Sequence, residues 1–274
     1  METKYQGKSL SLFKKSLKGI AAGVCAVGLC ALARKVKSRV GTLDIAQSLE
    51  GIPFPGTDLY SFLATRELKP MYTEMAGEIL KEKEFHKLLD ISTGLGYMPI
   101  ELALHCKDCL VIGMDESADM VRIAEDNARA SHVRNTVDFV TGSVTNLPFP
   151  GRYFDLVTSI NVLHHWEDPV SVMEEIYHVL LPGGEFWIYD YRYETPQKVW
   201  DDAKERLPLY LRLPFTIGPV GGWKAAYAER ELRRMIEGTR FEVLSIEPKT
   251  FTIFEQKLPA FTLARLRKPS TTTD

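Results

Sequence analysis

Residues 88–103 read LLDISTGLGYMPIELA: a short apolar run that includes Asp90, a glycine turn, and the start of a helix pattern. Gly94 and Gly96 let a ligand approach the backbone closely, and the N-terminus of the helix offers free N–H groups. The dinucleotide fingerprint G-x-G-x-x-G requires a third glycine where this chain has Pro99, and no segment matches the phosphate loop G-x-x-x-x-G-K-[ST]. The turn therefore predicts a ligand other than a pyrophosphate or a triphosphate.

Short apolar runs alternate with helix patterns on both sides of this turn. The pattern predicts strands at 87–92, 109–114, 137–141, 154–160 and 185–190, and helices at about 97–106, 117–131 and 169–180. Such alternation indicates βαβ units and a parallel sheet that is covered by helices on both faces. Two more strands, at about 241–248 and 260–267, bring the expected sheet to seven strands.

The flanking segments have a different pattern. Residues 41–86 predict a helical lead-in, amphipathic from Asp58 to Leu80, that caps the site. The core is expected over 87–268, with an apolar insertion at 192–230 and a disordered tail at 269–274. Within the insertion, a helix is expected at 196–206 and another at about 223–237. The stretch 207–223 is so rich in proline and glycine that neither a helix nor a strand is predicted there.

The charge is divided between the two ends of the chain, although the formal net charge is only −2. Residues 1–40 hold nine basic side chains and one acidic side chain, whereas the remaining residues hold 25 basic and 35 acidic ones. Nucleic-acid enzymes need a basic path for phosphates, so the acidic body argues against a nucleic-acid partner. A basic end on an acidic body suggests two separate roles.

The basic end brackets an apolar run, GIAAGVCAVGLCALA, at residues 19–33. As a helix it would be about 22 Å long, shorter than the ~30 Å hydrocarbon core of a bilayer. It could be an uncleaved anchor over 17–34, a shallow or re-entrant anchor, or a signal peptide cleaved after Ala33; a buried helix or a flexible tail are the other interpretations. We favour an uncleaved N-terminal apolar anchor helix over residues 1–40.

The four cysteines are too few for a disulfide framework in a chain of 274 residues. Cys106 and Cys109 form a C-x-x-C pair without a second such pair, so no metal site is predicted. We expect all four cysteines to be reduced thiols in a reducing compartment.

Asp115 follows the glycine turn at a spacing that suits a ribose-binding carboxylate. It ends the second predicted strand, 19 residues after Gly96. A carboxylate there can accept hydrogen bonds from both hydroxyls of a ribose. A ribose acid without pyrophosphate chemistry fits a nucleoside that is joined to an amino acid.

The segment from about 87 to 190 resembles the class I S-adenosylmethionine (SAM)-dependent methyltransferases. The motifs that carry the resemblance occur in the family's order: DISTGLG, GMDESADMVRIA, GSVTNLPFP, SINVLHHWEDP and LLPGG. The overlap is closest to the branch of quinone C-methyltransferases and small-molecule or sugar O-methyltransferases. The resemblance implies an α/β fold with a doubly wound, mainly parallel, seven-stranded Rossmann-like sheet, and SAM as the cofactor.

The resemblance also implies roles for single residues. Asp90 would orient the glycine turn and the amino group of the cofactor, and Asp115 would hold the ribose. The other implied cofactor-binding residues are Gly94, Gly96, Glu116, Met120 and Asn161. Two positions depart from the family's pattern: Ser92 replaces its first glycine, and Ser143 replaces the acid that contacts the adenine amino group, although a serine hydroxyl can still accept that bond.

Candidate catalytic residues follow the fourth and fifth predicted strands. His164 and His165 come after the fourth strand, and Asp190 ends the fifth, so a His–Asp pair is expected where the carboxyl ends meet. A carboxylate would orient the imidazole and raise its basicity. We prefer His164 as the base, with Tyr189 and Tyr191 as alternatives, while one of the histidines could instead cap the next helix.

The acceptor is expected to be small and lipophilic, because the lead-in and the insertion are both apolar. The aromatic and aliphatic side chains concerned are Tyr60, Phe62, Leu63, Met71, Tyr72, Tyr210, Leu211, Leu213, Phe215, Ile217 and Trp223. They could equally pack on the sheet. The leading hypothesis is a membrane-associated methyltransferase whose catalytic domain faces the cytosol, where SAM is made. The alternative is a non-catalytic SAM-binding or assembly protein, and the sequence leaves the acceptor atom and the oligomeric state open.

Overall fold

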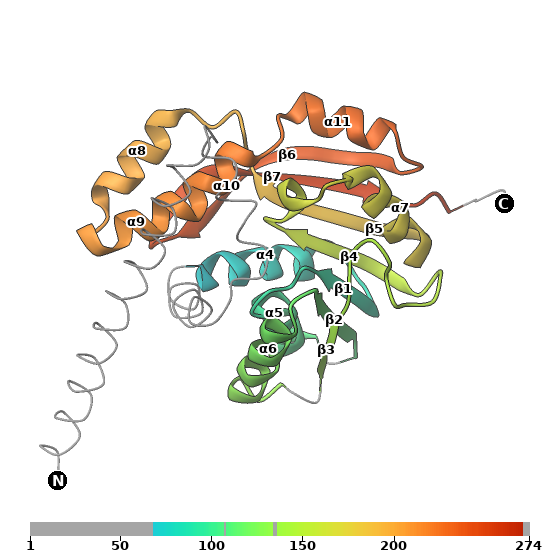
Figure 1. Cartoon of the computed structure of the whole chain (residues 1–274). Coiled ribbons are helices and arrows are strands. Elements are labelled where there is room, and N and C mark those ends of the chain that lie inside the picture. Colours follow the sequence, from blue (N-terminus) through green and yellow to red (C-terminus); the bar gives the residue numbers. More distant parts are fainter. Residues whose placement is uncertain (1–67, 107, 134–135, 271–274) are drawn as a thin grey trace, which may run out of the picture. The chain divides into compact units, whose positions relative to one another are not determined.

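The computed structural model describes residues 68–106, 108–133 and 136–270, all within one compact unit, Leu63–Asp274 (Figure 1). The expected anchor at 1–40, the lead-in before residue 68 and the last four residues of the tail lie outside the described residues. Within the described ranges, no helix has the length and apolarity needed to cross a membrane.

A seven-stranded sheet forms the centre of the unit, in the order β3-β2-β1-β4-β5-β7-β6 (Figure 1). Strands β1 to β5 are parallel, and β7 runs antiparallel to both β5 and β6. The strands are β1 (Lys87–Ile91), β2 (Leu110–Asp115), β3 (Val137–Thr141), β4 (Phe154–Ile160), β5 (Leu180–Tyr191), β6 (Glu242–Ile253) and β7 (Gln256–Arg267). This confirms the doubly wound, mainly parallel sheet.

Helices cover both faces of the sheet because successive strand residues point to opposite sides. Leu88 and Leu156 join the hydrophobic cluster that includes side chains of α4, α5 and α6, whereas their neighbours Leu89 and Val157 join the cluster with α7 and α11. These helices are α4 (Lys69–Glu82), α5 (Tyr97–His105), α6 (Ala118–Ala130), α7 (Pro169–Val179) and α11 (Glu229–Glu237). The predicted α5, α6 and α7 are thus confirmed within two residues.

The insertion is helical where no regular structure was expected. After α8 (Gln197–Arg206), the chain forms α9 (Leu209–Ile217) and α10 (Pro219–Ala225), so the prediction of an irregular 207–223 is wrong. Pro208 and Pro219 stand at helix starts, where a missing N–H costs nothing, and Gly218 separates the two helices. The helix expected at 223–237 begins only at Glu229.

The last two strands are longer than expected and form a hairpin. Phe254 and Glu255 join them with φ values of 49° and 58°, so the predicted loop between 248 and 260 is wrong. Two left-handed residues are typical of a two-residue hairpin turn, but Phe and Glu are not the residues that usually signal it. The sequence therefore carried no turn signal at this place.

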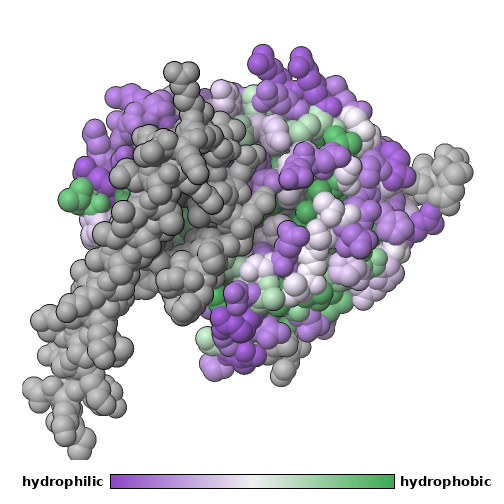
Figure 2. Space-filling model, viewed as in Figure 1, coloured by the Kyte–Doolittle hydropathy of each residue, from purple (hydrophilic) through white to green (hydrophobic). Residues whose placement is uncertain are grey.

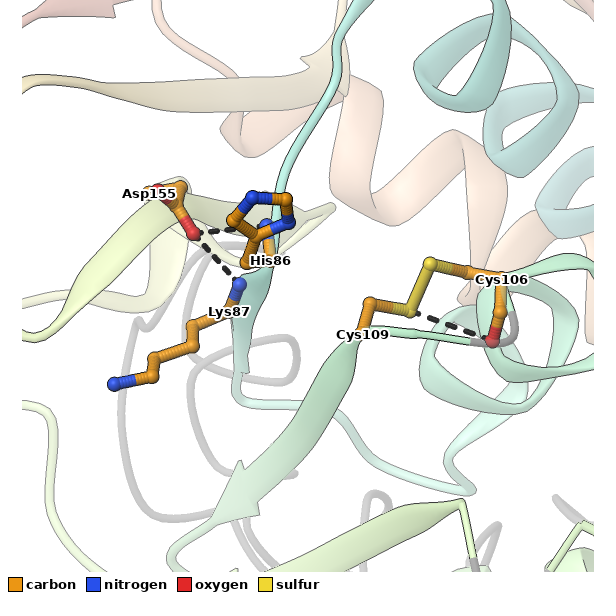
Figure 3. The surroundings of a disulfide bond; sticks show 5 residues. All are labelled: His86, Lys87, Cys106, Cys109 and Asp155. Atoms are coloured by element: carbon orange, nitrogen blue, oxygen red, sulfur yellow. Dashed lines mark hydrogen bonds between the residues drawn. A yellow bond between two sulfur atoms is a disulfide. The ribbon is translucent and has the colours of Figure 1, made fainter.

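The two cysteines of the C-x-x-C pair are bonded to each other (Figure 3). Cys106 follows α5 and Cys109 precedes β2, and their Cα atoms lie 5.8 Å apart. The expectation of four reduced thiols is therefore wrong for this pair. Figure 3 also shows Asp155 of β4, whose Oδ2 accepts the backbone N–H groups of His86 and Lys87 at 2.9 and 2.7 Å and so fixes the start of β1.

Gly96 is required by both backbone and packing. It begins α5 with φ 76°, and a Cβ there would lie 2.7 Å from the Phe139 ring and 2.8 Å from Ala124 Cβ. We expect Gly96→Ala to lower the free energy of unfolding by about 1–3 kcal/mol in urea denaturation. Gly77→Ala in α4 is the matched control, since its Cβ would meet nothing within 4 Å; it should raise stability by about 0.5–1 kcal/mol. Equal effects of the two substitutions would contradict this view of the turn.

Candidate active site

The candidate site lies where the carboxyl ends of β1, β2, β4 and β5 meet. β1 pairs with β2 on one side and with β4 on the other. Doubly wound sheets bind their ligands beyond the carboxyl ends of the strands at such a reversal of strand order. Asp90, Asp115, Asn161 and Asp190 all lie at or just beyond these strand ends. The structure therefore gathers the residues that the sequence motifs singled out.

Asp90 is buried and holds the glycine turn against β4. Its Oδ2 accepts the Thr93 hydroxyl at 2.6 Å, and its Oδ1 accepts the Thr158 hydroxyl at 2.7 Å. Burial raises the pKa of Asp90 to about 7, although the hydrogen bonds from Thr93 and Thr158 oppose this rise. The expected role of Asp90 in orienting the turn has a structural basis in these bonds, and its contact with the cofactor stays a prediction.

The raised pKa of Asp90 links its protonation to stability. The folded value of about 7 exceeds the ordinary 3.8, so the folded state binds more protons between these pH values. We expect the free energy of unfolding of the ligand-free protein to fall as pH rises through this window, by at most about 1.4 kcal/mol per pH unit. Urea denaturation at a series of pH values measures the slope.

Asp90→Asn provides the comparison for this prediction. The amide keeps the size of the side chain and can still bond with Thr93 and Thr158, but it does not titrate. The difference between wild type and Asp90→Asn should therefore grow across the window, whereas exposed Asp119→Asn should leave the wild-type slope in place. Parallel curves for wild type and Asp90→Asn would show that Asp90 does not titrate in this range.

The glycine turn is tightly folded. Ser92, Gly94 and Gly96 have φ values of 53°, 56° and 76°, and the Thr93 N–H donates to Met114 O at 2.9 Å. Ser92, which replaces the family's glycine, thus adopts the left-handed conformation at a cost that glycine would avoid. A Cβ on Gly94 would meet nothing within 4 Å, which leaves open space beside the turn.

Asp115 joins the end of β2 to the turn. Its Oδ2 accepts the Gly94 N–H at 2.8 Å, and its Oδ1 accepts the Ser117 N–H at 3.0 Å. Burial raises the pKa of this carboxyl, against the hydrogen bonds from Ser117 and Gly94. Glu116 beside it is exposed, and Met120, one turn into α6, is buried.

Ser143 lies near Asp115 through the chain that leaves β3. The preceding Gly142 donates its N–H to Asp115 O at 3.0 Å. The half-buried Ser143 hydroxyl lies 3.0 Å from the Thr145 hydroxyl and accepts the Thr145 N–H at 3.4 Å. The serine at this family position therefore lies close to Asp115 in the chain's fold, and its contact with an adenine stays a prediction.

Asn161 lies just beyond β4 with φ 56°. Its N–H donates to Tyr189 O at 2.7 Å, and its Nδ2 lies 3.9 Å from Met71 Sδ of α4. Its Oδ1 is buried and makes no hydrogen bond within the described part of the chain. A buried acceptor of this kind is a candidate for a bond to a ligand.

His164 and Asp190 form the pair that the sequence predicts. His164 Nδ1 lies 3.0 and 3.2 Å from the two carboxylate oxygens, and both side chains are buried. A carboxylate that accepts from Nδ1 leaves Nε2 of the neutral imidazole with its lone pair, so Nε2 is the nitrogen that can take a proton. Burial alone would lower the pKa of His164, but the charge and hydrogen bond of Asp190 outweigh it and raise that pKa above its usual value.

The other candidate bases are less suited to the role. Burial, followed by the charge of His164, lowers the pKa of His165 to about 4, and the two imidazole rings lie 4.2 Å apart. Burial raises the pKa of Tyr189 far above its ordinary value. Tyr191 packs against Phe261 at a ring distance of 5.1 Å. The geometry thus favours His164 among the four candidates.

Two features of the site were not predicted from the sequence. The Thr93 and Thr158 hydroxyls that hold Asp90 carry no pattern of their own, although Thr93 lies within the turn motif. Gly222 of α10 approaches the pair, since a Cβ there would lie 2.6 Å from the Tyr191 ring and 3.5 Å from His164 Nε2. Only a helix in the insertion brings this glycine to the site, and no helix was expected there.

Similarity to known proteins agrees with this geometry. A family model described as a methyltransferase domain matches residues 89–188. The uncharacterized methyltransferase YcgJ of Bacillus subtilis is 30% identical over 54% of this chain and 57% of its own length. The erythromycin 3''-O-methyltransferase of Saccharopolyspora erythraea is 31% identical over 57% of this chain and 45% of its own length. The demethylmenaquinone methyltransferase of Porphyromonas gingivalis is 33% identical over 38% of this chain and 43% of its own length. The chain thus spans about half the length of these relatives.

Solved structures share the fold. The plantazolicin methyltransferase BpumL, solved in complex with SAH, superposes with a TM-score of 0.61 over 83% of this chain and 95% of its own, at 14% identity. A SAM-dependent methyltransferase from Aquifex aeolicus superposes with a TM-score of 0.58 over 79% of this chain and 100% of its own, at 16% identity.

The sheet order, the ordered motifs and these matches define the class: the chain carries a class I SAM-dependent methyltransferase domain. SAM is the cofactor of this class. The described residues fit it, because Asn161 Oδ1 is a buried acceptor without a partner among the described residues and the space beside Gly94 is open.

Proposed function

We propose that this protein transfers the methyl group of SAM to a small, lipophilic acceptor at a membrane surface. The observation that carries the proposal is the buried His164–Asp190 pair at the carboxyl ends of β4 and β5. The pair lies on the same side of the sheet as the ends of β1 and β2, where the cofactor is expected to bind. An oriented imidazole with a raised pKa suits an acceptor that must lose a proton. A hydroxyl is such an acceptor.

Each residue has a distinct part in this proposal. Asp190 accepts the His164 Nδ1–H and keeps Nε2 as the basic nitrogen. His164 Nε2 takes the proton of the acceptor, while Asp115 and Asn161 hold the cofactor so that acceptor and methyl carbon are aligned. SAM supplies a methyl carbon that is electrophilic because it is bonded to a sulfonium.

The acceptor class is supported by the relatives and, within the insertion, only by its exposed apolar side chains. Relatives named for a quinone and for a macrolide substrate point to small, apolar acceptors. In the described part of the insertion, Leu211, Phe215 and Trp223 are buried, so they pack in the core, whereas Tyr210 and Leu213 are exposed. Met71 of α4 is buried and contacts Asn161, and Tyr72 beside it is half-buried. The membrane association through residues 17–34 and the cytosol-facing orientation rest on the sequence.

The direct test uses the purified full chain, methyl-labelled SAM and a lipid extract. We expect label to appear in an organic-phase product that is 14 Da heavier than its precursor, and His164→Ala to abolish most of this transfer. Calorimetry with SAM alone runs in parallel. Binding of SAM without methyl transfer to any component would favour the non-catalytic alternative, which is motivated by the departures from the family's pattern at Ser92 and Ser143. Absence of SAM binding would overturn the SAM-dependent function.

A further inference from the structure

The outer face of α9 is the most exposed large apolar surface among the described residues. Leu209, Tyr210 and Leu213 are 82%, 68% and 49% exposed, and Leu209 and Tyr210 exceed every other large hydrophobic side chain described. Figure 2 shows hydrophobic atoms that project at the left edge of the view, near α8 and α9, next to strongly hydrophilic ones. Contiguous apolar side chains of this kind mark an interaction surface.

This face is presented by a helix that is held firmly from within. Phe215 is fully buried, and its ring lies 5.2 Å from that of Phe254 and 6.0 Å from that of Trp200. Arg212 donates to the backbone oxygens of Leu207 and Glu205 at 3.1 and 2.9 Å. The outer side chains are therefore exposed because the inner ones fix the orientation of α9.

The charge around α9 differs from that of the rest of the body. Residues 197–225 hold five basic and three acidic side chains, although residues 41–274 as a whole hold 25 basic and 35 acidic ones. The basic side chains are Lys198, Lys204, Arg206, Arg212 and Lys224. An acidic body would be repelled by anionic lipid headgroups, so this locally basic segment is the part that such a surface would attract.

We propose that the outer face of α9, formed by Leu209, Tyr210 and Leu213, inserts into the interfacial region of an anionic lipid bilayer. The proposal rests on the membrane-surface function proposed above and specifies which face makes the contact. Leucine side chains enter the acyl boundary, and a tyrosine suits the headgroup level because its ring is apolar and its hydroxyl is polar.

The position of α9 gives this contact a role in substrate access. α10 follows α9 after a single residue, Gly218, and carries Gly222 against Tyr191 and near His164 Nε2. Lipid at α9 would thus be adjacent to the segment that borders the proposed base. An apolar acceptor dissolved in that lipid would lie next to the insertion that borders the site.

The test places a tryptophan on this face. Tyr210→Trp in the full chain is mixed with vesicles of brominated phosphatidylcholine in which about a third of the lipid is phosphatidylglycerol. The native residues Trp166, Trp187, Trp200 and Trp223 are all buried, so the new indole dominates the accessible emission. The control is Val243→Trp, because Val243 is also exposed but pairs with Leu266, at the far end of the hairpin from Phe254 and α9.

We expect bromine to lower the added emission of Tyr210→Trp about twofold and to leave that of Val243→Trp unchanged. Equal quenching of both variants would overturn the proposal. The absence of quenching in both variants while the chain sediments with the vesicles would also overturn it. A blue shift of the Tyr210→Trp emission without lipid that grows with protein concentration would instead identify a second copy of this chain as the occupant. The mixture contains neither SAM nor acceptor, so a negative result leaves the methyl-transfer assay as a separate test.

Discussion

His164→Ala is expected to lower kcat for methyl transfer by about 10²–10⁴-fold while the dissociation constant of SAM stays unchanged. The variant loses the only buried imidazole whose Nδ1 is held by a carboxylate in the described structure, at 3.0 Å from Asp190. The acceptor would then have to lose its proton to water. Steady-state kinetics with the acceptor identified from the lipid extract, together with calorimetry for SAM, separates the two effects.

Asp190→Asn and pH provide the sharper form of this prediction. Because Asp190 raises the pKa of His164, the rate should fall as pH falls through that raised value, where the imidazole becomes protonated and cannot act as a base. Without the negative charge, the falling limb of the pH profile should move to lower pH. His178→Gln on the exposed side of α7 is the matched control and should retain the wild-type profile. A profile that is identical in wild type and Asp190→Asn would remove His164 from the role of base.

Asp115→Ala is expected to weaken SAM binding by about 10²–10³-fold, as measured by calorimetry on the full chain. In the proposed site, the substitution removes the acceptor for the two ribose hydroxyls. It also frees the Gly94 N–H, which Asp115 holds at 2.8 Å, and so loosens the glycine turn. Asp119→Ala, an exposed carboxylate in the first turn of α6, is the control and should bind SAM normally. An unchanged affinity of Asp115→Ala would place the ribose elsewhere.

The sequence predicts the parallel half of this fold well because βαβ units have a strong local signal. Buried strands such as β1 and β2 are mainly apolar runs, and helix α6 begins after Ser117, whose hydroxyl accepts the Met120 N–H at 3.4 Å. Such signals lie within a few residues of the element that they define. They set the strand ends, and with them the positions of Asp90, Asp115 and Asp190.

The insertion and the hairpin could not be predicted in the same way. Helix α9 contains Pro214 and forms because Leu211 and Phe215 are buried against other parts of the chain, which outweighs the local preference. The hairpin turn uses Phe254, whose ring packs against Phe215. In both cases long-range packing decides the local structure, so the approach of Gly222 to His164 was beyond the reach of sequence patterns.

The bond from Asp115 to the Gly94 N–H has a consequence for how the site meets its cofactor. It fixes the carboxylate and the turn relative to each other in the ligand-free chain, so their conformational entropy is lost during folding and not during binding. In the proposed site, a preorganised cradle of this kind makes cofactor affinity depend on how firmly the carboxyl ends of β1 and β2 are held. Substitutions that loosen these strand ends at a distance from the ligand are therefore expected to weaken SAM binding, and saturating SAM is expected to raise the melting temperature of the fold.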